Sequence, residues 1–222
     1  MSLKPQKKTD LGKEWLSKRR DNRRAIHPEY HLIVTEGTKT EPEYFEAIKK
    51  CVNEKYRERV QLEVFGEGYN TIGLFERAKR RAENSPNGYK HVWIVYDTDD
   101  FPRDRIDAVP ELCDDYSTPE RQYHAIWSNQ CIELWFLLHF SFLHSDLHRS
   151  GYFPKLERCL RKIHAGSYKK NRNDMFEILR PYMDSAIANA KKLDKRNEGR
   201  SPSESAPGTK VFEFVEKIKP YI

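Results

Sequence analysis

Short apolar runs rich in β-branched and aromatic residues alternate with amphipathic stretches along the first two thirds of the chain. The runs at 30–34, 60–65, 90–96 and 122–127 predict four strands. The third run is nearly continuous in apolar residues, which is typical of a central parallel strand buried on both faces. The stretches at 40–52, 71–83 and 129–142 predict helices. Strands that alternate with helices indicate βαβ units, and therefore an α/β fold with a mostly parallel central sheet flanked by helices.

Beyond residue 150 the pattern is helical, with predicted helices at 153–164, 172–195 and 211–219. We therefore divide the chain into a basic N-terminal arm (1–27), an α/β core (28–149) and a helical C-terminal region packed on that core (150–222).

At the first predicted helix, Thr40 is placed to cap the helix and Glu43 to return the hydrogen bond three residues later. This pattern predicts that the helix begins at Thr40.

The net charge of the 222-residue chain is +6, and it is concentrated at one end. Residues 1–24 contain nine Lys or Arg and three Asp or Glu, so the remaining chain is neutral overall. The arm is either a solvated terminus or a contact for nucleic acid or a partner protein. Its charge excludes a secretory signal peptide, and no apolar run is long enough to span a membrane. The cysteines have no metal-site spacing, so we expect free thiols in the cytoplasm.

Acidic residues follow the predicted strands at the positions where ligands bind in open α/β sheets. Glu36 follows the first strand, Asp97 and Asp99 follow the third, and Glu133 lies in the first turn of the helix after the fourth. Such carboxylates would repel one another unless they are protonated or bridged by cations, and all-oxygen ligands suit Mg²⁺ or Mn²⁺. The implied chemistry is phosphodiester cleavage. The alternative is that these acids cap helices and form turns.

A basic segment follows the core in the sequence. Residues 155–172 contain seven Lys or Arg and one Glu, whereas residues 97–120 contain nine Asp or Glu and two Arg. A metal-dependent phosphodiesterase needs such a combination, because Lys and Arg hold the backbone phosphates of a nucleic acid. Lys169 or Lys170 could also neutralise charge in the transition state. Alternatively, both segments are solvated faces that pair with each other.

Three sequence blocks, at 33–45, 95–101 and 128–140, resemble in order and spacing those of the RloB-like family, which is related to abortive-infection proteins. The resemblance implies a Toprim-like fold, in which Glu36 is a metal ligand or general acid/base, Asp97 and Asp99 are metal ligands, and Glu133 belongs to the third block. It also implies phage defence, often with an ATPase partner. Gln130 replaces the usual proline of the third block, and residues 206–209 match the family's Asn-Pro-x-Thr pattern only weakly.

The leading hypothesis is a Mg²⁺- or Mn²⁺-dependent nuclease that acts on DNA or RNA in phage defence. Glu36, Asp97, Asp99 and Glu133 are its predicted catalytic and metal-binding residues, and Lys169 or Lys170 would assist them. The alternative is a catalytically silent nucleic-acid-binding or regulatory subunit of a defence complex. A primase- or topoisomerase-like strand transferase is a third reading, for which the sequence singles out no tyrosine nucleophile. No Walker loop is present, so ATPase activity would have to come from a partner.

Overall fold

The computed structural model describes residues 27–98 and 101–222, so most of the predicted basic arm and Asp99 lie outside the described residues. The described strands are β1 (Glu29–Thr35), β2 (Val60–Gly66), β3 (Tyr89–Thr98) and β4 (Gln122–Asn129). They form one parallel sheet in the order β2-β1-β3-β4. The prediction of an α/β fold with a parallel central sheet is thereby confirmed.

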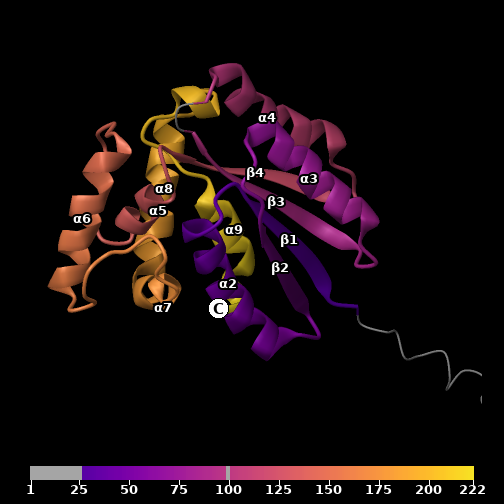
Figure 1. Cartoon of the computed structure of the whole chain (residues 1–222), viewed down its shortest axis with the longest axis horizontal. Coiled ribbons are helices and arrows are strands. Elements are labelled where there is room, and N and C mark those ends of the chain that lie inside the picture. The colour runs from indigo at the N-terminus through magenta and orange to yellow at the C-terminus, as the bar shows by residue number, and fades with distance from the viewer. Residues whose placement is uncertain (1–26, 99–100) are drawn as a thin grey trace, which may run out of the picture.

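Helices cover both faces of this sheet (Figure 1). One face carries α3 (Thr71–Asn84) and α4 (Arg103–Tyr116), and the other carries α2 (Thr40–Tyr56). Successive residues of a strand point to opposite faces, so Leu32 and Val34 pack with α3 and α4 whereas Ile33 packs with α2. The buried strands therefore read as continuous apolar runs because each face has its own hydrophobic cluster.

The C-terminal helices lie on the same side of the sheet as α2 (Figure 1). They are α5 (Glu133–Leu138), α6 (Arg149–Lys162), α7 (Met175–Leu179), α8 (Met183–Arg196) and α9 (Val211–Ile218), with short 3₁₀ turns η2 (Arg180–Tyr182), η3 (Pro202–Glu204) and η4 (Lys219–Tyr221). Trp135 of α5 and Phe214 of α9 belong to the hydrophobic cluster that contains Ile33. Among the described residues, no helix combines the length and apolar character that a membrane span needs.

Several predicted helix boundaries are wrong. The helix expected at 129–142 is only α5, because Asn129 ends β4 and Gln130 has a φ of 64°. The helix expected at 172–195 is interrupted by η2, where Pro181 lacks the N–H that a continuous helix requires. Helix α4 was not predicted, because its many acidic residues obscure a buried stripe of Ile106, Val109 and Cys113.

The predicted capping box at the start of α2 is also wrong. Lys39 occupies the N-cap position and no side chain caps the helix. The Thr40 hydroxyl instead donates a hydrogen bond of 2.9 Å to the backbone oxygen of Lys170. The start of α2 is therefore tied to the loop that follows α6, 130 residues further along the chain.

Candidate active site

The first two acidic positions meet at the C-terminal edge of the sheet. Glu36 follows β1 and Asp97 lies near the end of β3, and these two strands are neighbours. The backbone N–H of Asp97 donates to Glu36 Oε2 at 3.3 Å, and the backbone N–H of Glu36 donates to the carbonyl of Val95 at 2.8 Å. Parallel pairing thus brings the Glu36 carboxylate to the backbone of Asp97, as the sequence predicts.

Glu41, in the first turn of α2, adds a carboxyl group that we did not predict as a site residue. Its side chain is hydrogen-bonded to Asp97, and only 7% of Glu41 is exposed. Burial raises the pKa of Glu41, the nearby Glu133 carboxylate raises it further, and the Lys170 charge lowers it. The hydrogen bond to Asp97 also lowers the pKa of Glu41, so the net rise comes from burial and from the Glu133 charge.

The Glu41 carboxyl occupies space left by the missing side chain of Gly37. A Cβ atom at Gly37 would lie 2.0 Å from Glu41 Oε2, which is far below contact distance. The Gly37-Thr38-Lys39-Thr40-Glu41 sequence therefore holds a signal for this residue, namely a glycine four positions before a glutamate at a helix start. As a capping pattern, the same segment predicts only a helix start.

Glu133 lies at the first position of α5 and is 1% exposed. The Tyr168 hydroxyl donates to Glu133 Oε1 at 2.5 Å, and the Cys131 side chain is also hydrogen-bonded to Glu133. Burial raises the pKa of both Tyr168 and Cys131, and the negative charge of Glu133 raises both further. Tyr168 comes from the loop after α6, so its contribution could not be read from the spacing of the acidic residues.

The same loop brings one of the two predicted lysines to the site. The positive charge of Lys170 acts on Glu41, and its Nζ lies 5.2 Å from the centre of the Phe153 ring. For Lys169, the described contact is made by its backbone carbonyl, which accepts from the N–H of Arg172 at 3.1 Å. Of the two lysines, the structure therefore brings the side-chain charge of Lys170 to the carboxyl groups.

The carboxyl groups at this edge form a chain from Glu36 through Asp97 and Glu41 to Glu133. They are not packed as tightly as the ligands of a preformed ion site. In the described part of the chain, only Glu29, His31 and His91, at the opposite edge, place their ligand atoms within 4.8 Å of one another. The all-oxygen character of the chain of acids nevertheless matches hard cations such as Mg²⁺, which bind through few carboxylates and several waters.

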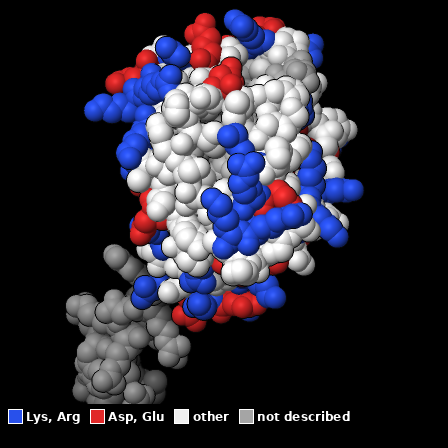
Figure 2. Space-filling model, turned by 90° about the vertical axis from the view of Figure 1, so that its left-hand side faces the viewer, with Lys and Arg blue, Asp and Glu red and all other residues white. Residues whose placement is uncertain are grey.

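A basic surface adjoins this edge. Helix α6 exposes Lys155, Arg158, Arg161 and Lys162, and Figure 2 shows Lys and Arg side chains gathered on this side of the molecule, with acidic side chains between them. The Glu157 carboxylate of α6 accepts a hydrogen bond of 2.5 Å from the backbone N–H of Tyr168. The Glu157–Tyr168 hydrogen bond thus connects α6 to the loop whose Tyr168 side chain contacts Glu133.

The fold and this edge define the class of protein: a parallel α/β protein with clustered carboxyl groups at the C-terminal ends of its strands and a basic helix beside them. The chain belongs to the RloB-like protein family, which it matches over residues 31–218. The family prediction made from the three sequence blocks is thereby confirmed, whereas the Toprim-like assignment stays a prediction. Comparisons with curated proteins and with solved structures found no match.

Proposed function

We propose that this RloB-like protein is a metal-dependent nuclease with a Toprim-like site that acts in phage defence. The observation that carries the proposal is the meeting of Glu36 and Asp97 at the ends of two adjacent parallel strands, with Glu41 hydrogen-bonded to Asp97. Ligands of open α/β sheets bind at this edge. Membership of the RloB-like family supports the defence role.

Mg²⁺ or Mn²⁺ fits the residues present. All the ligand atoms that the acidic side chains offer are oxygens, and burial together with the neighbouring Glu133 carboxylate raises the pKa of Glu41, so carboxyl groups are gathered here in a poorly solvated place. Glu36, Asp97 and Glu133 would hold the ion, together with Asp99, which lies outside the described residues. Once bound, such an ion polarises a phosphate oxygen and lowers the pKa of coordinated water.

Side chains of the protein would transfer the proton, neutralise the developing charge and bind the phosphates. The Glu41 carboxyl, whose pKa is raised, can hold a proton and release it to the oxygen that leaves the cleaved phosphodiester. Lys170 can neutralise negative charge that develops beside that oxygen. Tyr168 fixes the orientation of Glu133 through its hydroxyl. Lys155 and Arg158, both exposed on α6, would bind backbone phosphates on either DNA or RNA.

The direct test is cleavage by the purified full-length protein, assayed on DNA and RNA with Mg²⁺ or Mn²⁺. We expect Asp97→Asn to abolish cutting, because the amide keeps the shape of the side chain but loses its negative charge. Asp115→Asn, an exposed position on α4, is the matched control and should cut at the wild-type rate. Undiminished cutting by Asp97→Asn would refute the assigned site.

A second function, that of a silent nucleic-acid-binding or regulatory subunit, is favoured by one observation. Tyr168 caps the Glu133 carboxylate at 2.5 Å, and Glu133 is 1% exposed, so this acid is closed off in the described conformation. Tight, metal-independent nucleic-acid binding without cutting under any metal tested would favour this function. We further propose that the protein acts in the cytoplasm with a separate ATPase partner, which its resemblance to the RloB-like family implies. Co-purification of an ATPase with the tagged protein from its native host tests that partnership.

A further inference from the structure

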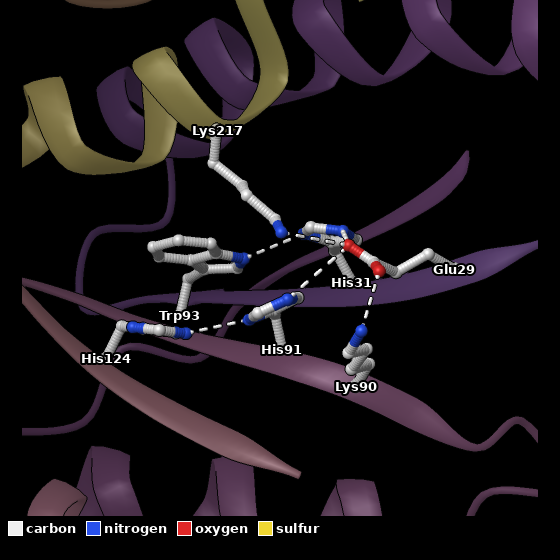
Figure 3. A network of polar contacts seen from close by, with 7 residues as sticks. All are labelled: Glu29, His31, Lys90, His91, Trp93, His124 and Lys217. Carbon is white, nitrogen blue, oxygen red and sulfur yellow. Dashed lines mark hydrogen bonds and ion pairs between the residues drawn. The ribbon is translucent and has the colours of Figure 1, made fainter. Parts of the chain in front are cut away.

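A second polar cluster lies at the opposite, N-terminal edge of the sheet (Figure 3). Glu29 and His31 come from β1, His91 from β3 and His124 from β4. The pairing register places His31 directly beside His91, so both imidazoles point to the same face of the sheet. Lys217, from α9, reaches down onto this face (Figure 3). The cluster is separate from the carboxyl groups of the candidate active site, because parallel strands keep their two ends at opposite edges.

Three of these side chains have the spacing of metal ligands. Glu29 Oε1 lies 3.0 Å from His31 Nε2 and 3.4 Å from His91 Nε2, and all three ligand atoms lie within 4.8 Å of one another. Zn²⁺ binds nitrogen and oxygen at about 2.0–2.2 Å in a tetrahedron, which separates neighbouring ligand atoms by roughly 3.3 Å. Small side-chain movements would therefore bring the three atoms to coordination distance.

One ring nitrogen of His91 has no hydrogen-bond partner in the part of the chain that the structure describes. The residue is 4% exposed, and its Nε2 makes no hydrogen bond with any described residue even though Glu29 is near. Its other nitrogen, Nδ1, lies 2.9 Å from His124 Nε2. When Nδ1 donates its proton to His124, the lone pair of Nε2 points toward the Glu29 carboxylate. Histidines that bind metals almost always donate their other N–H in this way, so His124 is a positioning residue for His91.

His31 is held in the opposite tautomer. The indole N–H of Trp93 can only donate, and it donates to His31 Nδ1 at 3.1 Å, so the proton of a neutral His31 lies on Nε2, 3.0 Å from Glu29. A metal ion at Nε2 would take the place of that proton. The proton would pass to solvent or to Nδ1, and in the second case the hydrogen bond from Trp93 would be lost. Metal binding should therefore alter the surroundings of the Trp93 indole.

A lysine side chain already places positive charge beside the Glu29 carboxylate. Lys217 Nζ lies 3.3 Å from Glu29 Oε1, and its side chain is 41% exposed, so it can move out into solvent. Lys90 Nζ contacts the other oxygen, Glu29 Oε2, at 3.1 Å and leaves Oε1 available. Lys217 therefore competes with a metal ion for the same carboxylate oxygen.

We propose that Glu29, His31 and His91 bind one divalent ion of the zinc type, in competition with the Lys217 ammonium. Imidazole nitrogens with a single carboxylate favour Zn²⁺, Co²⁺ or Ni²⁺ over Mg²⁺. Burial lowers the pKa of both His31 and His91 to about 4, so neither imidazole is protonated at neutral pH. The ion would join β1 to β3 at the edge of the sheet farthest from the candidate active site.

Zn²⁺ titration of the full-length protein by calorimetry, with Mg²⁺ in excess to occupy carboxylate sites, tests this proposal. We expect one equivalent of Zn²⁺ to bind. His91→Gln should weaken binding by at least about 100-fold, because losing a ligand costs more than losing the partner of a ligand. His144→Gln, which changes an exposed histidine, should bind as the wild type does. Failure to bind one equivalent, or equal binding by His91→Gln, would overturn the proposal.

Lys217→Met tests the proposal while keeping all three proposed ligands. Removing a positive charge beside the ion should tighten Zn²⁺ binding at least about tenfold, and it should enlarge the rise in Tm that Zn²⁺ produces. Co²⁺ should quench tryptophan fluorescence in the wild type, and most of that quenching should disappear in Trp93→Phe. Unchanged affinity in Lys217→Met, or quenching that persists without Trp93, would contradict the assigned position of the ion.

Discussion

Gly37 and Glu41 are fitted to each other at the start of α2, because a methyl group on Gly37 would place its carbon 2.0 Å from Glu41 Oε2. Gly37→Ala should therefore push the Glu41 carboxyl away from Asp97. We expect a loss of about 1–3 kcal/mol in the free energy of unfolding, as for other overpacked sites, and weaker Mn²⁺ binding. Urea unfolding and Mn²⁺ titration measure the two effects.

The control for this prediction is Gly88→Ala, since nothing lies within 4 Å of a Cβ atom at Gly88. Adding Glu41→Ala to Gly37→Ala should recover much of the lost stability, because the clashing carboxyl group is then gone. A Gly37→Ala variant with wild-type stability and wild-type Mn²⁺ affinity would show that Glu41 moves aside without cost.

Tyr168→Phe should destabilise the protein through Glu133. The substitution removes the hydroxyl that donates to Glu133 Oε1, and it leaves a carboxylate that is 1% exposed without this donor. Loss of a hydrogen bond to a buried charged group costs about 1.5–3 kcal/mol, measurable by urea unfolding. Tyr182→Phe is the control, because the described contact of that ring is with Phe140 and not with an acidic residue of the site. In a Glu133→Gln background the loss should be smaller, and an undiminished loss would show that the Tyr168 hydroxyl acts elsewhere.

The fold was largely predictable from local patterns, because β1 to β4 are rich in β-branched and aromatic residues and are separated by amphipathic helices. Helix α4 was missed even though Ile106, Val109 and Cys113 have helical spacing, since acidic residues dominate its composition. The break of the C-terminal helix at Pro181 could also have been predicted. These errors concern single helices and leave the order of the four strands along the chain unchanged.

The candidate site was predictable only where the topology of the sheet determines it. Glu36 and Asp97 meet because adjacent parallel strands end at one edge. The position of the Glu41 carboxyl depends on the space that Gly37 leaves free, and Tyr168 contacts Glu133 across 35 residues of sequence. Neither arrangement produces a periodic pattern in the sequence. The histidines at the other edge lie within strands, where a single polar residue in an apolar run looks like part of the core. Only the pairing register shows that His31 and His91 are neighbours.

Acid should unfold the protein through the histidine cluster. Burial lowers the pKa of His31, His91 and His124 to about 4, against an ordinary value of 6.5. The unfolded chain therefore binds more protons than the folded protein between these values. The stability linked to these neutral imidazoles is fully present above pH 6.5 and is lost as the pH falls toward 4, at most roughly 3 kcal/mol per imidazole.

Urea unfolding at a series of pH values measures this dependence. His124→Gln should lose less stability than the wild type between pH 6.5 and pH 4, because one of the three titrating groups is absent. His144→Gln changes an exposed histidine and should retain the wild-type slope. If His124→Gln also retained that slope, the acid sensitivity would have to arise outside the cluster.

Reversing charge on α6 should weaken nucleic-acid binding. Lys155 and Arg158 are both exposed on this helix, which is connected to the candidate active site through Glu157 and Tyr168. In the double variant Lys155→Glu/Arg158→Glu, we expect weaker binding to all sequences alike, since phosphate contacts carry no sequence information. Fluorescence anisotropy across a range of salt concentrations should show a salt slope reduced by about 1 for each lost phosphate contact.

The matched control is Lys50→Glu/Lys55→Glu, which makes the same charge change at exposed positions of α2. If nucleic acid follows α6, this control should retain most of the wild-type affinity and salt slope. Equal weakening by the two double variants would mean that net charge, and not the α6 surface, determines binding. Because both variants lower the net charge by the same amount, only the position of the lost charges can produce a difference between them.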